Sequence, residues 1–482
     1  MTVPSFSRNL ALLSTGQIIG RLILFGTTIY LTRVLSAENF GITAFATGVL
    51  AWAALIVDFG LMQYAPLEVA RQSLPATTLM RNVIGLRLVL TLAGFGALLL
   101  FVGIAPVTSV TALVIMIYGI SLVTTAADLD WLFLGAQLMH VSAAAEILNQ
   151  AVMLTGVLIF VHGPEDVILV PIVYLVSRLA SSAFLIVMAF RRFGRVMPGI
   201  DRQVAKRLVL AAAPLAGTAG LAMVSHNFDL IYIGLVLGSA PAGLYAAAYR
   251  VVWVPTLLVT SYYVVLRPIF AKASTSGIGT IESLLGRSTR IAMGLVPGVV
   301  AGGVLLAEPL VTLLFGQEYA AAAQPLQLLF LALGLLTISR NYRLILVCFN
   351  RQGMDFWIMS GAAAINLVLN IVLIPHYGLT GAAAATVASE VFILIAGYIA
   401  TRILIRHVPL GRYLVRPAIA VSLMLALVAV TGALPLLARA MLGAVSYIVL
   451  IFLMRVITVT DVRAFIESLA AERAIESTEA GL

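Results

Sequence analysis

Apolar residues dominate the chain in long runs, which short polar or charged segments separate. Runs of about 20 residues are long enough for a helix to cross a hydrocarbon core of roughly 30 Å. Strict alternation of apolar and polar residues is absent and the runs are too long for barrel strands, so in lipid their backbone groups must be satisfied within helices. The pattern predicts about fourteen transmembrane helices, at residues 10 to 31, 41 to 63, 83 to 104, 110 to 136, 142 to 162, 167 to 190, 208 to 237, 242 to 266, 288 to 307, 322 to 349, 356 to 375, 378 to 404, 416 to 433 and 436 to 458.

The composition excludes a water-soluble globule. Hydrophobic residues make up 62% of the 482 residues and charged residues 10%, against about 25% charged residues in an ordinary soluble domain. The net charge of +9 comes from basic residues that lie between apolar runs, as membrane topology signals do, so no nucleic-acid partner is expected. The single Cys348 and five scattered histidines lack the spacing of a metal site, and we expect no metal or cofactor.

Loop charges predict the orientation of the chain. Most basic residues outside the runs follow even-numbered helices, and connections rich in Arg and Lys stay cytoplasmic. Both termini are therefore predicted inside, and residues 459 to 482 are predicted to form a solvated cytoplasmic tail. The basic residues that carry this prediction are Arg71, Arg81, Arg191, Arg192, Arg195, Arg202, Lys206, Arg207, Lys272, Arg287, Arg290, Arg351, Arg406, Arg412 and Arg416.

An internal repeat appears at an offset of 202 residues. An ungapped comparison of residues 29 to 71 with 231 to 273 pairs Gly41 with Gly243 and Pro66 with Pro268, and gives more than twice the roughly four identities expected by chance. The loop charges give both halves the same orientation, which predicts a parallel repeat of two pseudo-symmetric six-helix bundles. The predicted domains are an N-terminal lobe (1 to 190), a basic cytoplasmic linker (191 to 207), a C-terminal lobe (208 to 404), two further transmembrane helices (405 to 458) and the tail (459 to 482).

Three stretches of the sequence resemble polysaccharide flippases of the MOP superfamily. The most specific is GAAAINLVLNIVLIPHYGLTGAAAATVASE, at 361 to 390, which is similar to helices eleven and twelve of that family. The opening RNLALLSTGQIIGRLILFGTTIYLTRVLSAENFG with VDFGL at 57 to 61 resembles its first two helices, and NFDLIYIGLVLGSAPAGLYAAAYR at 227 to 250 is the counterpart in the second half. The resemblance covers nearly the whole chain.

This resemblance implies a fold and a function. The fold is the MATE-like one, with two six-helix lobes around a central cavity. The function is translocation of a lipid-linked (undecaprenyl-pyrophosphate) oligosaccharide across the bacterial inner membrane by alternating access, for cell-surface polysaccharide biosynthesis. Its partners would be that substrate, membrane lipids, and a polysaccharide polymerase with glycosyltransferases, and coupling to a proton or sodium gradient fits the same picture.

An anionic pyrophosphate head requires a cationic cavity, so arginines inside the predicted helices are the first candidates for substrate binding. Arg21 and Arg250 lie far from the helix ends, and a guanidinium suits bidentate contact with phosphate. Arg178 lies in the middle of the sixth helix, and Arg340 and Arg343 share a face of the tenth. The alternative for these last two is a place toward the cytoplasmic end of their helix, about 9 to 14 Å from residue 349, from which Arg343 reaches the lipid headgroups. The alternative for Arg21 and Arg250 is a buried ion pair with Asp229 or Glu390.

Acidic residues inside the predicted helices are candidates for ion coupling or structural ion pairs. Asp229, next to the polar candidate Asn227, and Glu390 belong to this group, because an intramembrane carboxylate needs a partner, water or a proton. Asp58 precedes Phe59 and Gly60, which indicates a turn at a helix end and a gating or structural role.

Two other functions compete with the flippase prediction. A cation-coupled multidrug exporter of the same fold would favour acidic residues over arginines in its cavity, which weighs against it. A membrane-embedded polysaccharide polymerase or ligase needs a large outward loop for the acceptor, and the predicted outward loops are short. We therefore expect a transporter and no catalytic residues.

The predicted topology can be tested by cysteine labelling in a Cys348→Ala background. Cysteines at 195 to 205 and at the C-terminus should be protected from an impermeant reagent added outside the cell, and cysteines at 163 to 166 and 316 to 319 should react. An outward C-terminus would contradict the even helix count and the repeat.

Overall fold

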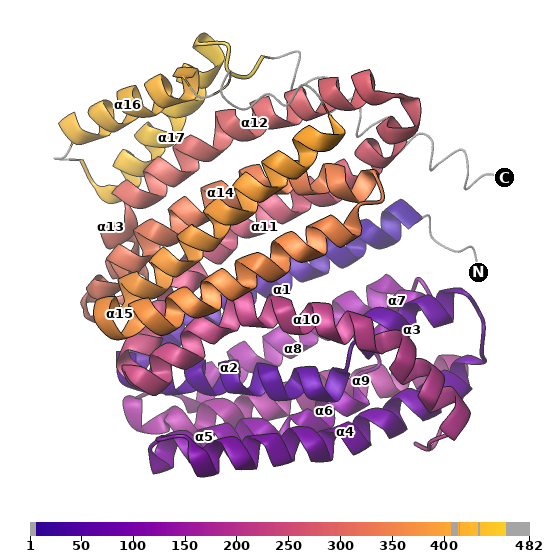
Figure 1. The fold of residues 1–482 in the computed structure, drawn as a ribbon. Helices are drawn as coiled ribbons and strands as arrows, with labels where there is room; N and C mark the ends of the chain where they lie inside the picture. The colour runs from indigo at the N-terminus through magenta and orange to yellow at the C-terminus, as the bar shows by residue number, and fades with distance from the viewer. Residues whose placement is uncertain (1–5, 406–412, 414, 432–433, 459–482) are drawn as a thin grey trace. The chain divides into compact units, whose positions relative to one another are not determined.

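The described part of the chain is helical. The computed structural model describes residues 6–405, 413, 415–431 and 434–458, and none of these residues lies in a β-strand (Figure 1). Ten helical stretches within them are long and apolar enough to cross a membrane. Each of the predicted intervals overlaps one or more of the observed helices. The prediction of an all-α, multi-pass membrane protein is confirmed, while the number of fourteen crossings stays a prediction.

The described residues divide into two compact units. The first extends to Gly243 and the second begins at Leu244. The helices of the first are α1 (Phe6–Val34), α2 (Ala37–Asp58), α3 (Leu61–Ala70), α4 (Ala76–Ile104), α5 (Ser109–Ile120), α6 (Leu122–Ala127), α7 (Asp130–Gly135), α8 (Met139–Phe160), the 3-10 helix η1 (Pro164–Ile168), α9 (Leu169–Phe193) and α10 (Arg202–Val236). The helix α11 (Ser239–Ser276) begins in the first unit and continues into the second.

The second unit contains the remaining helices. They are α12 (Ile278–Leu305), α13 (Ala307–Phe315), the 3-10 helix η2 (Gln317–Ala322), α14 (Ala323–Cys348), α15 (Gln352–Leu404), α16 (Val415–Val430) and α17 (Leu436–Leu453). The last two correspond to the predicted additional helices, and they pack against each other and against α12 (Figure 1). The predicted tail at 459 to 482, and Arg406 and Arg412, lie outside the described residues.

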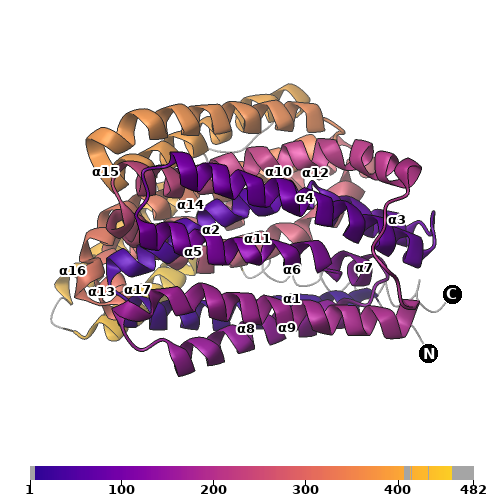
Figure 2. The ribbon, with the colours of Figure 1, turned by 90° about the horizontal axis from the view of Figure 1, so that it is seen from below.

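Apolar packing groups the helices of the first unit. The helix α8 packs against both α1 and α9, and Figure 2 shows these three helices side by side. The helix α2 packs against α4 and α5, and α10 packs against α2 and α3. A core cluster around the fully buried Leu61, Leu79 and Trp131 joins α3, α4 and α7. Because α10 packs on the first unit, that unit ends one helix later than the sequence division between lobes, and the six-helix lobes themselves stay a prediction.

Two of the predicted helices are interrupted. The first continues from α2 into α3 through Phe59 and Gly60, which both have positive φ, and this confirms the predicted helix end after Asp58. The second, predicted at 110 to 136, consists of α5, α6 and α7, with extended backbone at Asp128. Each interruption removes helical hydrogen bonds from backbone groups that lipid cannot satisfy. Polar side chains must therefore meet these groups.

The segment 361 to 390 forms most of a helical hairpin. Secondary structure runs without a break through α15, but Gly378 has φ 59° and ψ −136°, and the chain turns back there (Figure 1). The two arms, 352 to 377 and 379 to 404, match the predicted pair of helices. Small residues allow their close approach, since a Cβ atom on Gly381 would lie 2.4 Å from the carbonyl oxygen of Leu373.

Several basic residues assigned to loops by the sequence lie in helices. Arg81 belongs to α4, Lys272 to α11, and both Arg287 and Arg290 to α12. Of the predicted linker at 191 to 207, only residues 194 to 201 lie between α9 and α10, and the rest belongs to these two helices. Helices can extend past the hydrocarbon into polar surroundings, where hydropathy no longer marks them, and this explains the difference.

The two glycines paired by the repeat touch each other. A Cβ atom on Gly41 would lie 1.8 Å from the carbonyl oxygen of Ser239, and one on Gly243 would lie 2.2 Å from that of Ala37. Ala37 and Ser239 are themselves separated by the same offset of 202 residues. The contacts therefore join residues that the offset pairs, while the parallel repeat of two six-helix bundles stays a prediction.

We predict that Gly41→Ala or Gly243→Ala lowers the free energy of unfolding by about 3 kcal/mol, the upper range for overpacking, because the added methyl group meets backbone rather than a mobile side chain. Thermal unfolding of the purified protein in detergent measures this. Gly279→Ala is the matched control, since no atom lies within 4 Å of the Cβ position of this helical glycine. Equal stability of all three variants would contradict the contact.

Candidate functional site

The predicted site residues fall into both units. Arg21 on α1, Asp58 at the end of α2, Arg178 on α9, and Asn227 and Asp229 on α10 belong to the first unit. Arg250 on α11, Arg340 and Arg343 on α14, and Glu390 on α15 belong to the second. Each unit holds a polar cluster that includes some of these residues, Asp58 and Arg178 in the first and Arg340, Arg343 and Glu390 in the second.

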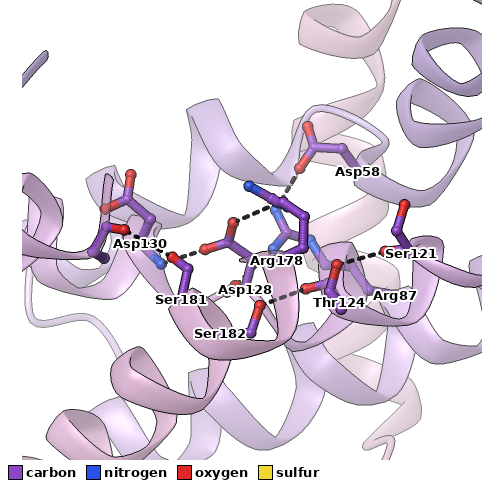
Figure 3. A network of polar contacts seen from close by, with 10 residues as sticks. Asp58, Arg87, Ser121, Thr124, Asp128, Asp130, Arg178, Ser181 and Ser182 are labelled. Atoms are coloured by element: carbon purple, nitrogen blue, oxygen red, sulfur yellow. Dashed lines mark hydrogen bonds and ion pairs between the residues drawn. The ribbon is translucent and has the colours of Figure 1, made fainter. Parts of the chain in front are cut away.

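The cluster in the first unit centres on Arg87 of α4. Its side chain is 2% exposed and forms an ion pair with Asp58 (Figure 3). Asp58 Oδ1 also accepts a hydrogen bond of 3.0 Å from the backbone nitrogen of Met62. The carboxylate therefore satisfies the start of α3 beyond the break at Phe59 and Gly60. The predicted roles of Asp58 are gating and structural, and this hydrogen bond is the kind of contact that the structural role requires.

Arg87 also binds the second helix break. Its Nη1 atom donates 3.0 Å to the carbonyl oxygen of Asp128, which ends α6. Asp128 Oδ1 accepts from the backbone nitrogen of Asp130 at 2.9 Å and thereby caps the start of α7. One guanidinium thus supports two interrupted helices, because it carries enough donors for both.

Arg178 joins the same cluster from α9. Its Nη2 atom lies 3.3 Å from Asp128 Oδ2, and the two side chains are about equally exposed, 24% and 21% (Figure 3). One turn further along, Ser181 donates 3.1 Å to the carbonyl oxygen of Ala145 on α8. The charge of Arg178 is therefore engaged by a carboxylate, which favours a structural ion pair over phosphate binding.

Arg87 is not among the site residues predicted from the sequence. The predicted helix began at residue 83, which placed Arg87 near a helix end, whereas α4 begins at Ala76 and carries Arg87 into its interior. An earlier helix start would have identified it as an intramembrane arginine. Its partner Asp58 lies 29 residues away in sequence, and no local pattern predicts such a pair.

In the second unit, Arg343 forms a bidentate ion pair with Asp355. Its Nε and Nη2 atoms donate to Asp355 Oδ1 and Oδ2 at 2.6 and 3.0 Å. Asp355 lies in the first turn of α15, where a negative charge is also favourable to the helix dipole. This pair fixes the end of α14 to the start of α15.

Arg340 has a different environment, although it shares a helix face with Arg343. Its Nη1 atom donates 3.1 Å to Thr260 Oγ1 on α11, and this hydroxyl donates in turn to the carbonyl oxygen of Thr256 at 2.9 Å. Within the described residues, no carboxylate forms a salt bridge with Arg340. Its positive charge is held by a neutral hydroxyl group.

The hairpin α15 contains a buried polar strip. Asn370 donates 2.9 Å to Asn366 on the same arm, and Asn366 contacts Ser389 on the other arm at 3.5 Å. Glu390 follows Ser389 and is 9% exposed. The positive charges of Arg340 and Arg343 act on this carboxylate. The hairpin thus brings an acidic residue near the two arginines of α14.

The remaining predicted residues have contacts of their own. Arg21 is half-buried, and the Arg250 guanidinium lies 5.6 Å from the centre of the Trp253 ring. Asn227 donates to Met223 Sδ at 2.9 Å, and Asp229 is 2% exposed and accepts from the backbone nitrogen of Leu230 at 2.8 Å. The predictions that Arg21 and Arg250 bind substrate and that Asp229 takes part in ion coupling stay predictions.

Comparison with solved structures defines the class of protein by its fold. The fold is similar to that of the lipid II flippase MurJ in an inward closed conformation, with a TM-score of 0.72 and 12% identity over 91% of this chain and 98% of the other. A multidrug resistance MATE family transporter of the MOP superfamily, outward-facing, gives a TM-score of 0.51 and 15% identity over 84% and 96%. The chain has the MATE-like fold of membrane transporters.

The chain belongs to the polysaccharide biosynthesis protein family, whose model matches residues 6–274, more than half of the sequence. One relative is the teichuronic acid biosynthesis protein TuaB of Bacillus subtilis, 30% identical over 24% of each chain. Another is the probable low-salt glycan biosynthesis flippase Agl15 of Haloferax volcanii, 26% identical over 33% of this chain and 34% of the relative. The matches thus span about a quarter and a third of these relatives. The resemblance stated from the sequence is confirmed.

Arg87→Ala is predicted to lower the free energy of unfolding by about 3 to 5 kcal/mol, because it leaves Asp58 and the Asp128 carbonyl without their shared donor. Thermal unfolding in detergent reports the change. The control Arg402→Ala removes an exposed arginine that lies over Tyr398 and should have little effect. Adding Asp58→Asn to Arg87→Ala should recover part of the loss, and wild-type stability of Arg87→Ala alone would contradict this role.

Proposed function

We propose that this protein is a flippase that translocates an undecaprenyl-pyrophosphate-linked oligosaccharide across the bacterial inner membrane by alternating access. Membership of the polysaccharide biosynthesis protein family supports this function. The fold likeness to transporters and the name of the Agl15 relative agree with it. Transport of such a lipid requires no covalent chemistry, so we expect no catalytic residues. Both termini are proposed to be cytoplasmic.

The observation that carries the proposal is Arg340, with which no carboxylate of the described residues forms a salt bridge. Arg340 lies eight residues before the end of α14, about 12 Å along the helix axis. An arginine at the centre of a membrane helix is unfavourable by at least about 2.5 kcal/mol on insertion scales unless water or a counter-charge accompanies it. A pyrophosphate group supplies such a counter-charge, and a guanidinium binds it through two parallel hydrogen bonds.

The other arginines differ from Arg340 in their partners. Arg178 and Arg343 are paired with Asp128 and Asp355, so substrate would have to displace a carboxylate from either. Arg21 and Arg250 are proposed as further pyrophosphate ligands. A multidrug exporter of organic cations would gain nothing from the unneutralised charge of Arg340. The same charge therefore favours an anionic substrate.

Arg340→Ala should reduce lipid-linked oligosaccharide flipping in proteoliposomes by at least about tenfold, because a hydrogen bond to a charged group contributes about 1.5 to 3 kcal/mol. Arg340→Lys should recover part of the activity, since it keeps the charge and loses the bidentate geometry. The measurement is quenching of a fluorescent substrate that reaches the outer leaflet. Arg402→Ala is the matched control, and wild-type rates for Arg340→Ala would refute the site.

A further inference from the structure

Glu390 combines burial with incomplete hydrogen bonding. It is 9% exposed, and within the described residues no donor reaches its Oε2 atom. It lies in the second arm of α15, inside a candidate membrane span. A buried charged carboxylate persists only when it is paired or hydrogen-bonded. Glu390 therefore needs either a cation or a proton.

Of the neighbouring cations, one is available to form an ion pair with the Glu390 carboxylate. Arg340 and Arg343, both on α14, are the charged groups that act on Glu390. Arg343 is already neutralised by Asp355. The groups of α11 that act on Arg340 are the phenol of Tyr263 and the cation Arg267, and neither provides a negative charge to it. Arg340 and Glu390 are thus single complementary charges without a salt bridge between them.

The hairpin brings these two residues within reach of each other. A Cβ atom on Gly397 would lie 3.7 Å from Cγ of Arg343, which places the second arm of α15 beside α14. The chain reverses direction after α14 and again at Gly378, so this arm runs parallel to α14. Glu390 lies seven residues before Gly397 and Arg340 three before Arg343, an offset of about 6 Å along the axes. A long arginine side chain can cover this offset.

We infer that Glu390 competes with the anionic substrate for Arg340 and takes up one proton when the substrate occupies that arginine. In one state the carboxylate pairs with Arg340. In the other, pyrophosphate takes the guanidinium, and Glu390 binds H⁺ from water on the side to which the site is open. With Arg340 turned to Thr260, as here, the guanidinium is available to an external anion. The inference rests on the proposed function and adds to it a specificity residue and the origin of proton coupling.

The direction of the pH effect follows from the proton count. The substrate-bound state holds one proton more than the free state, so a rise in pH favours the free state. The dissociation constant for substrate should therefore increase with pH, by up to about tenfold per unit for one linked proton. Titration of the pyrophosphate itself affects binding to all variants equally. Its contribution therefore cancels when the pH dependence of one variant is compared with that of another.

The test measures binding of undecaprenyl pyrophosphate to the purified full chain in detergent. Isothermal titration in two buffers of equal pH and different ionisation enthalpy gives the number of protons taken up. Wild type should take up about one proton more than Glu390→Gln, which keeps the shape and removes the charge. Glu390→Gln should also bind about tenfold more tightly at pH 8, since the competing carboxylate is gone. The control Glu308→Gln changes an exposed residue of α13 and should match wild type.

The outcomes separate this inference from the proposed function. Equal proton uptake by wild type and Glu390→Gln overturns the role of Glu390, and loss of binding in Arg340→Ala would then still uphold the anion site. Wild-type binding by Arg340→Ala overturns both. If Glu390→Gln does not elute as a folded monodisperse species, Glu390→Met provides the same uncharged comparison. Proton uptake equal to that of wild type in Glu390→Met overturns the role of Glu390 in the same way.

Discussion

Backbone groups freed by a broken helix have to be satisfied inside a membrane, and the first unit depends on how Arg87 meets this requirement. The same guanidinium reaches the Asp58 carboxylate, which caps α3, and the carbonyl oxygen of Asp128 between α6 and α7. Two interruptions in different helices are thereby held by one side chain of α4. Without this donor, each break would leave polar groups unsatisfied, and the core around Leu61 and Trp131 would lose the support on both sides.

The two arginines of α14 in the second unit differ in their partners. Arg343 forms a closed bidentate pair with Asp355 that joins α14 to α15. Arg340, one turn earlier, ends on the hydroxyl of Thr260. Arg343 is already paired with a carboxylate and needs no ligand. Arg340 contacts a neutral hydroxyl group, so an anion can bind it at a smaller desolvation penalty than it would bind Arg343. The polar strip of Asn366, Asn370 and Ser389 fixes the hairpin that carries Glu390 beside these arginines.

Much of the fold could be predicted from the sequence, because long apolar runs have few alternatives in lipid. The helical intervals, the turn after Asp58 and the hairpin at 361 to 390 all follow from local composition and from glycine positions. The breaks at Ser121 and Asp128 were not predicted, because the few polar residues around them lie within one long apolar run and do not by themselves mark where a helix ends. The repeat is visible in the sequence as an offset of 202 residues, and only the structure shows that Gly41 and Gly243, which this offset pairs, lie in contact.

The sequence by itself determined that this is a helical membrane protein, that it resembles polysaccharide flippases, and which residue types could bind a pyrophosphate. Only the tertiary structure decided which arginines keep their charge available. Arg178 pairs with Asp128 over 50 residues of sequence, Arg343 with Asp355 over 12, and Arg340 with no described carboxylate. Intramembrane arginines look alike in a sequence, because what distinguishes them is the partner that packing brings to each one.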